Sequence, residues 1–468
     1  MNPKRLSRRS FLKSSVAVAA FVSSGSLAYS SDSAQVFNNA PVSPLKIPGW
    51  RRGHLHQHSF WSDGSATLEE ACSLYRDAGY EFVIPSDHGR FQADTDKWFT
   101  LEGGKKAAFE RGQERYKFPM ETKEEDGKLQ LRMRNFDEIS ALLNQEDRFL
   151  LIPGHELTTH GADGVQVHSN LINSREEVTQ ELVDKLEGQA PAMFMSRPIT
   201  GDKTSPRCSG YEAVGWSLRA HKEMIGDRPK DEVVVMFNHP DWIWYDLQPE
   251  WLCEQPEIRF FELVNCGPNL PVRPDFWTME KYWDIINAFR ADRNQPLIMA
   301  TATDDTHNYQ RFYNDFETAA GGSVMVRCDS LDAVDLMKAM NRGDFYAAVG
   351  VWLDDIQFDK STGTLAVDVH AEQDVNYRID FIGTRRGFDK AFTTIDSPKE
   401  GKFPARKINT YSESVGEIFK TVEGTHAEYT MTDDDLYVRA RITAMIPARC
   451  TMRGKPEHPS AWTQPVQK

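Results

Sequence analysis

Three histidines alternate in the segment HLHQHSFWSDG, at positions 54, 56 and 58, and an acidic residue, Asp63, follows five residues later. If the segment is extended, the period of two puts the three imidazoles on one face. A buried row of imidazoles is costly unless something binds it, and neutral imidazole is the commonest protein ligand of divalent metals. A wetted surface strand would also tolerate the pattern, but the segment favours a metal site.

More side chains that can bind metal stand near the ends of apolar runs predicted to be buried strands. These runs are EFVIP (81–85), FLLIP (149–153), VVVMFN (233–238) and PLIMATAT (296–303). The side chains that follow them are His88, Glu156, His239, Asp305 and His307. His168 lies inside a fifth predicted strand, 165–172, and the run IRFFELVN (258–265) is a sixth predicted buried strand. The carboxyl ends of parallel strands converge, and ligands bind there in open sheets and barrels. A single His beside a strand is usually a core residue, but the coincidence of all of them predicts one metal centre.

Strands and helices alternate from about residue 50 to 310, which predicts an α/β domain with parallel strands. Helices are predicted at 67–79, 280–292 and 331–349. Two segments break the alternation. Residues 92–135 are crowded with charge and Gly, and residues 188–210 are rich in Pro and Gly. Both are interpreted as insertions over one face, either lids or solvated excursions.

After Gly350 the sequence alternates apolar and polar residues at the period of a strand. Residues 351–468 are therefore predicted to form a separate, small all-β domain resembling a sandwich. This part holds only His370 and His426 of the 13 histidines. We interpret it as a packing or docking module without chemistry of its own.

Residues 1–28 are predicted to be a signal peptide, because SRRSFLK precedes an apolar run and a small-residue cleavage site. The paired Arg8 and Arg9 resemble a bacterial twin-arginine export signal. Residues 29–49 are rich in Ser, Asn and Pro and are interpreted as a linker. These features predict a periplasmic or secreted protein.

The composition limits the partners of the chain. A net charge of −14 over 468 residues argues against a nucleic-acid duplex as the main partner, but it leaves room for a local basic pocket that binds a small anionic substrate. No apolar run after the signal approaches the length of a membrane span. The six cysteines are scattered, with no Cys-x-x-Cys motif, and nothing in the sequence indicates an oligomeric state.

The order of these motifs resembles the PHP (polymerase and histidinol phosphatase) superfamily of metal-dependent hydrolases. The matching motifs are, in order, His56-Gln57-His58, Ser62-Asp63-Gly64, Asp87-His88, Gly154-His155-Glu156, His168, His239-Pro240 and Asp305-Thr306-His307. The resemblance covers about residues 50–350. One position departs from the family pattern, because His54 stands where Asp is usual. His54 is therefore left open as a ligand, a partner of a ligand or a spectator.

The resemblance implies a distorted (β/α)7 barrel over 50–350 that binds three divalent metal ions, whether Zn, Mn or Fe. Carried over residue by residue, it implies the following ligands: His56, His58, Glu156 and Asp305 for the first metal, Glu156, His168 and His239 for the second, and Asp63, His88 and His307 for the third. Asp87 and Asp304 are candidates to hydrogen-bond ligand imidazoles or to cap turns.

The chemistry expected of such a centre is hydrolysis of a phosphate mono- or diester by a metal-bound hydroxide. Glu156 and Asp305 are the expected catalytic ligands, and Arg90 is the best-placed cation for the phosphate, ahead of Lys203 and Arg207. For each of these cations, a plain surface charge is the more usual role. Two alternatives stay open: hydrolysis of a carbamate or carboxylic ester on the same metals, and an exported binding protein with a degenerate site.

Overall fold

A computed structural model describes residues 46–186, 190–193, 208–242, 245, 247–267, 276–309, 319–399, 405–448 and 457–468. All of these residues belong to one compact unit that spans Val42–Lys468. The predicted export signal, most of the predicted linker, and both Lys203 and Arg207 lie outside the described residues.

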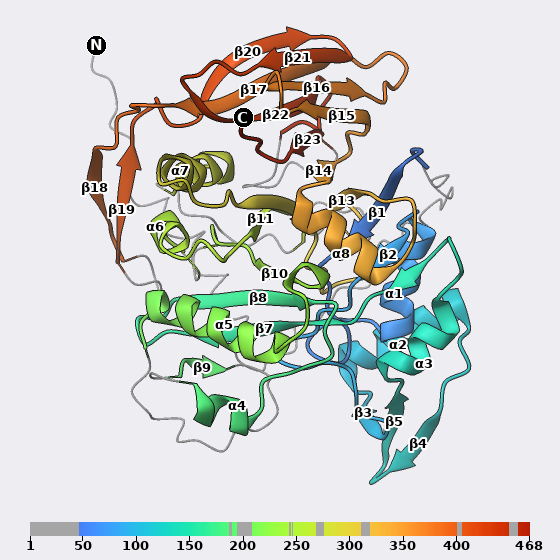
Figure 1. The fold of residues 1–468 in the computed structure, drawn as a ribbon. Helices are drawn as coiled ribbons and strands as arrows, with labels where there is room; N and C mark the ends of the chain where they lie inside the picture. Colours follow the sequence, from blue (N-terminus) through green and yellow to red (C-terminus); the bar gives the residue numbers. More distant parts are fainter. Residues whose placement is uncertain are drawn as a thin grey trace, which may run out of the picture. The chain divides into compact units, whose positions relative to one another are not determined.

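A six-stranded sheet carries much of the predicted metal centre (Figure 1). Its strands run in the order β12, β11, β10, β8, β7, β9. Their bounds are β7 Gly154–His160, β8 Gln166–Ile172, β9 Ala192–Met193, β10 Val234–Phe237, β11 Phe260–Asn265 and β12 Met299–Thr303. Strands β10, β11 and β12 are parallel to one another, whereas β8 is antiparallel to both β7 and β10.

A nine-stranded sheet joins the N-terminal strands to strands from the end of the chain, in the order β20, β17, β22, β23, β14, β13, β1, β2, β6. Their bounds are β1 Trp50–His54, β2 Phe82–Val83, β6 Leu150–Leu151, β13 Ser323–Arg327, β14 Phe345–Val349, β17 Tyr377–Arg385, β20 Glu417–Glu423, β22 Asp435–Ala444 and β23 Ser460–Thr463. Parallel pairing links β1 to β2 and β2 to β6, as the apolar runs predicted.

The protein is thus a mixed α/β structure, but the described strands form no closed barrel. The strands expected in one barrel are divided between the two sheets, because β1 pairs on its outer edge with β13 and the β7–β8 pair is antiparallel. Two single parallel bridges, Gln57–Thr306 and His88–Glu156, link the sheets just where the predicted ligands stand.

Most of the described helices begin at a residue whose side chain caps the first turn. Their bounds are α1 Leu68–Asp77, α3 Phe136–Leu143, α4 Gln180–Lys185, α5 Gly210–Ile225, the 3₁₀ turn η1 Lys230–Glu232, α6 Pro249–Cys253, α7 Met279–Asp292 and α8 Ala333–Arg342. Thr67 caps α1 as predicted, by accepting from the backbone N–H of Glu70. The helix predicted over 331–349 is too long: Gly343 takes a φ of 85° and ends α8, and the remaining residues form β14.

The first predicted insertion folds into a small unit of its own (Figure 1). It contains β3 Lys97–Thr100, α2 Gly103–Tyr116, β4 Thr122–Glu125 and β5 Lys128–Met133. The three strands form an antiparallel sheet in the order β3, β5, β4. Ala108 and Phe109 of α2 are buried in one apolar cluster with Phe60 and Trp61, which follow the histidine-rich segment. The insertion is therefore packed against the chain that leads to Asp63.

The described elements after residue 350 are all strands. Those outside the large sheet are β15 Leu353–Asp359, β16 Thr364–Val369, β18 Phe392–Ser397, β19 Arg406–Tyr411 and β21 His426–Thr430. Helix α7 packs against β22 through buried charge: Arg439 donates from Nε (2.9 Å) and a terminal nitrogen (2.7 Å) to the two carboxylate oxygens of Asp284. Among the described residues, no helix has the length and apolarity needed to cross a membrane.

Candidate metal centre

The nine side chains predicted to bind metal come together, and a tenth, Glu262, joins them. They form four overlapping groups, and within each group the potential ligand atoms all lie within 4.8 Å of one another. The groups are His58, Asp63, His88 and His307; His56, His58 and Asp305; His56, His239 and Glu262; and His88, Glu156 and His168. The centre lies where the two sheets meet. It takes side chains from three strands, β7, β8 and β11, and from the segments that follow β1, β2, β10 and β12.

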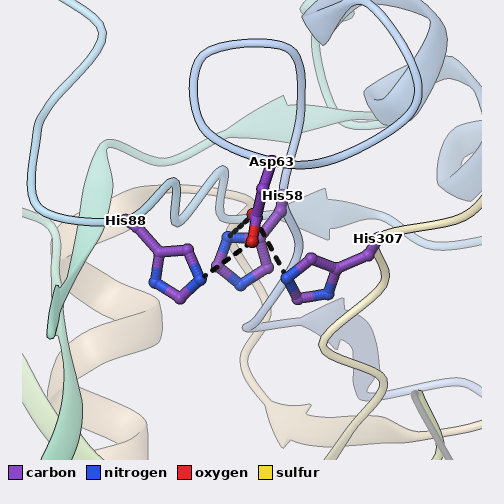
Figure 2. Close-up of side chains that lie close together, drawn as sticks. All are labelled: His58, Asp63, His88 and His307. Carbon is purple, nitrogen blue, oxygen red and sulfur yellow. Dashed lines mark ion pairs between the residues drawn. The ribbon is translucent and has the colours of Figure 1, made fainter. Parts of the chain in front are cut away.

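The outer group consists of His58, Asp63, His88 and His307 (Figure 2). Figure 2 shows three imidazoles arranged around the Asp63 carboxylate. One carboxylate oxygen, Oδ1, lies 3.2 Å from His307 Nε2, and the other lies 3.6 Å from His88 Nε2. The side chains of Asp63 and His307 are 37% and 25% exposed, whereas that of His58 is fully buried. This group is therefore where the centre faces solvent.

The inner groups meet at two buried carboxylates, Glu156 and Asp305. Asp305 Oδ1 lies 2.8 Å from His58 Nε2 and 3.2 Å from His56 Nε2. Glu156 Oε1 lies 3.3 Å from His56 Nε2 and 3.0 Å from His168 Nδ1. Asp305 Oδ2 also lies 3.7 Å from His239 Nε2. Each carboxylate thus faces imidazoles from more than one segment of the chain, which is the arrangement of a ligand shared between neighbouring cations.

Glu262 in β11 was not foreseen from the sequence. Its Oε1 accepts from His56 Nδ1 and from the Thr303 hydroxyl, both at 2.6 Å. Its Oε2 accepts from the backbone N–H of His239 at 2.8 Å and from Asn265 at 3.2 Å. An ionised carboxylate can only accept, so the proton of His56 must lie on Nδ1. The lone pair of His56 Nε2 then points at the inner carboxylates, which is how carboxylates orient metal-binding imidazoles.

The protonation states of His58, His168 and Glu156 suit a metal centre, whereas Asp305 and Glu156 outweigh burial and raise the pKa of His56 and His88 respectively. A cation would therefore have to displace a proton from those two imidazoles. Burial, with the neighbouring His307 and His88, lowers the pKa of His58 to about 4. Burial also lowers the pKa of His168 to about 3. Burial opposes ionisation of Glu156, but the surrounding imidazoles outweigh it and hold the pKa of Glu156 well below its usual range. Neutral imidazoles beside ionised carboxylates are the forms that bind divalent cations.

The residues present fit a divalent cation. Asp305 Oδ1 and Glu156 Oε2 are buried and accept no hydrogen bond of good geometry, although imidazole nitrogens crowd around them. Buried anionic oxygens without donors are expensive unless a positive charge faces them. Ligand atoms within 4.8 Å of one another suit a central ion with bonds of about 2.0–2.2 Å. Nitrogen and oxygen donors without thiolate fit zinc, manganese or iron.

Two of these residues have an uncommon backbone. His239 and Asp305 each follow the end of a strand and adopt positive φ angles of 27° and 49°. Such angles are rare for residues other than glycine and are retained only where the surroundings enforce them. For His239, the hydrogen bond from its N–H to Glu262 provides one such constraint.

Of the two roles expected for Asp87 and Asp304, the observed contacts favour the capping of turns over hydrogen bonding to ligand imidazoles. Asp87 accepts from the N–H and hydroxyl of Ser59, both at 2.8 Å, and from the Ser62 hydroxyl at 2.7 Å. Asp304 accepts from the Tyr75 hydroxyl at 2.8 Å and from the N–H of Gly322 at 2.6 Å. Both carboxylates fix the loops that lead to ligand residues.

His54 and Arg90 lie outside the four groups of described residues. His54 is fully buried and stacks on Tyr75, with ring centroids 3.9 Å apart, and its Nδ1 lies 3.8 Å from Asp304. Burial, with His56 nearby, lowers the pKa of His54 well below its usual value. Neutral His54 is thus a packing residue beneath the centre. Arg90 is half-buried, two residues beyond His88.

Comparison with solved structures finds nine matching chains, among them the following three remote likenesses. A two-domain protein of Bacteroides vulgatus, containing a predicted PHP-like metal-dependent phosphoesterase, shares 12% identity over 90% of this chain and 97% of its own, with a TM-score of 0.38. A Bifidobacterium adolescentis protein described as a metal-dependent phosphoesterase shares 13% identity over 57% of this chain and 92% of its own (TM-score 0.26). A Chromobacterium violaceum amidohydrolase shares 11% identity over 55% of this chain and 88% of its own (TM-score 0.26).

No family model and no curated protein matches the chain. Its function must therefore be inferred from the geometry of its own residues.

Proposed function

We propose that this chain is a metal-dependent hydrolase of the PHP type that cleaves phosphate mono- or diesters. The observation that carries the proposal is the overlap of four histidine–carboxylate groups, which share His56, His58 and His88. We also propose that β1, β2, β6–β7, β8, β10, β11 and β12 correspond to a distorted (β/α)7 barrel. The two single bridges between the sheets support this correspondence.

We assign the following roles to the residues of the centre. Glu156 and Asp305 would each hold two cations together, and Glu262 keeps Nε2 of His56 directed at them. The outer group is partly exposed, so an anionic phosphoryl group would approach from the side of Asp63 and His307. Bound divalent cations, three by our proposal, would supply Lewis acidity and make a water acidic enough to ionise near neutral pH. Arg90 is our proposed contact for the phosphate oxygens.

The test uses purified protein supplied with Mn²⁺ or Zn²⁺. We expect it to hydrolyse p-nitrophenyl phosphate or bis-p-nitrophenyl phosphate, and Glu156→Gln to reduce kcat by at least about 100-fold, as expected when charge stabilisation of a transition state is lost. His370→Ala is the matched control, because His370 is exposed and pairs with Asp354 at 2.7 Å, outside the centre. Full activity of the Glu156 variant would refute the proposal.

The same assay separates the alternatives. Cleavage of naphthyl carbamates or acetates, with both phosphate esters untouched, would favour a carbamate or carboxylic ester hydrolase. Cation binding without turnover of either class would favour an exported binding protein. Export by the twin-arginine pathway to the periplasm or beyond stays a proposal based on residues 1–28.

A further inference from the structure

Two lysines of the insertion donate to the loop that carries Asp63. We define this loop as residues 59–65 and call it the Asp63 loop. Lys105 of α2 donates from Nζ to the carbonyl oxygen of Asp63 at 3.1 Å and to that of Gly64. Lys97 of β3 donates to the carbonyl oxygen of Trp61 at 3.2 Å. The ammonium groups thus hold the loop by its backbone, which leaves the carboxylate of Asp63 directed at the outer imidazoles.

The lysines are held in place by packing between the insertion and the same loop. Phe60 stacks on Phe99 of β3, with ring centroids 4.9 Å apart and planes within 12° of parallel. The Lys97 ammonium lies 4.2 Å from the ring centroid of Trp61, and the Trp61 indole donates to the carbonyl of Arg134 at 3.1 Å. Together with the lysine hydrogen bonds, these contacts tie a segment that interrupts the α/β pattern to one short loop of the metal centre.

Asp63 depends on such support more than the other carboxylates do. It is the only carboxylate of the outer group, and its side chain is 37% exposed, whereas those of Glu156 and Asp305 are buried. Its loop also has little room to adjust: a Cβ on Gly64 would lie 2.4 Å from the carbonyl of His58. If the loop that carries an exposed acidic ligand can move, the affinity for a cation falls, because the loop must be ordered when the cation binds and this costs free energy.

We propose that Lys105 is a positioning residue for the cation that His58, Asp63, His88 and His307 would bind, which we call the outer cation. The insertion then sets the affinity of the outer group for this cation. The proposal rests on the metal centre proposed above. It adds that cation binding depends on Lys105, a residue that is not itself a ligand and lies in the insertion. The insertion is then part of the metal centre rather than a solvated excursion. Lys105 acts through Asp63 and needs no contact with the cation or the substrate.

The experiment measures Mn²⁺ binding to the metal-free full chain by equilibrium dialysis. The step that Asp63→Asn abolishes identifies the outer cation. We expect Lys105→Met to weaken this step by about 10- to 100-fold, the usual range for a residue that orients a ligand, and to leave the tighter steps unchanged. Lys106→Met is the matched control, because Lys106 is the exposed neighbour on α2 and is expected to keep every step. Lys105→Arg retains the donors and is expected to restore most of the affinity.

Outer-cation binding by Lys105→Met that is unchanged or tighter than in the wild type would overturn the proposal, as would equal weakening by Lys106→Met. If Lys105→Met proves poorly folded by circular dichroism, Lys105→Gln supplies the test, since it keeps one N–H donor and should weaken only the outer step. If the wild type binds no Mn²⁺, the metal centre itself is wrong. If the wild type binds Mn²⁺ and the Lys105 variants match it, only the role of Lys105 is wrong.

Discussion

Replacing Glu262 by Gln tests whether an unforeseen carboxylate sets the orientation of a metal ligand. Four donors surround the two oxygens of Glu262, at 2.6, 2.6, 2.8 and 3.2 Å. A glutamine side chain has only one acceptor oxygen, so its NH₂ group must face either His56 Nδ1–H or the N–H of His239. At least one hydrogen bond to a charged acceptor is lost, at a cost of about 1.5–3 kcal/mol.

That loss corresponds to a weakening of metal affinity by about 10- to 150-fold, close to the effect typical of residues behind metal ligands. The assay is competition between the metal-loaded protein and a chelator of known affinity, read out as zinc or manganese retained per chain. Glu257→Gln is the control, because Glu257 pairs with Lys222 at 3.0 Å on the surface and is expected to leave retention unchanged. Retention by Glu262→Gln equal to the wild type would refute the orienting role, and a folded protein that loses one whole equivalent would indicate that Glu262 is itself a ligand.

Two further predictions concern stability. Asp284→Asn should lower the free energy of unfolding in urea by about 3 kcal/mol, because the fully buried Arg439 loses the carboxylate that accepts two of its hydrogen bonds. A change below about 1 kcal/mol would contradict this expectation. His221 is buried and burial lowers its pKa to about 3, so the folded state excludes a proton that the unfolded chain binds below about pH 6.5. The stabilisation that neutral His221 gives the folded state is therefore complete above pH 6.5. It falls by about 1.4 kcal/mol for each pH unit as the pH drops toward 3. The difference in unfolding free energy between wild type and His221→Gln should shrink along that range, and a constant difference would show that His221 does not titrate as described.

Local patterns predicted those strands that depend on burial alone. Each of six predicted apolar runs contains an observed strand, and the run VVVMFN, for example, contains β10. The strand β7 was missed, because GHELTTH is polar along much of its length and becomes a strand through pairing with β8. The division of the strands between two sheets was likewise beyond local pattern, because whether β1 pairs with β13 or across to β12 depends on residues some 250 positions apart.

The same distinction holds for the centre. The alternating His56 and His58 mark it plainly, since such a row has few uses other than metal binding. Glu262 gave one weak signal, an acidic residue in a strand expected to be buried. Its role emerges only when folding brings it to His56, 206 residues away in sequence. Lys105 gave no local signal, because a lysine on a charged helix is ordinarily a solvated residue.

The most direct measurement is the divalent metal content of the full chain, determined by mass spectrometry of the elements after purification without chelators. We expect about three equivalents of zinc, manganese or iron per chain, and loss of most of them in His58→Ala, because His58 belongs to two of the four groups. A wild-type protein that carries none of these metals, and takes up none on incubation with Mn²⁺ or Zn²⁺, would show that these histidines and carboxylates form no metal centre.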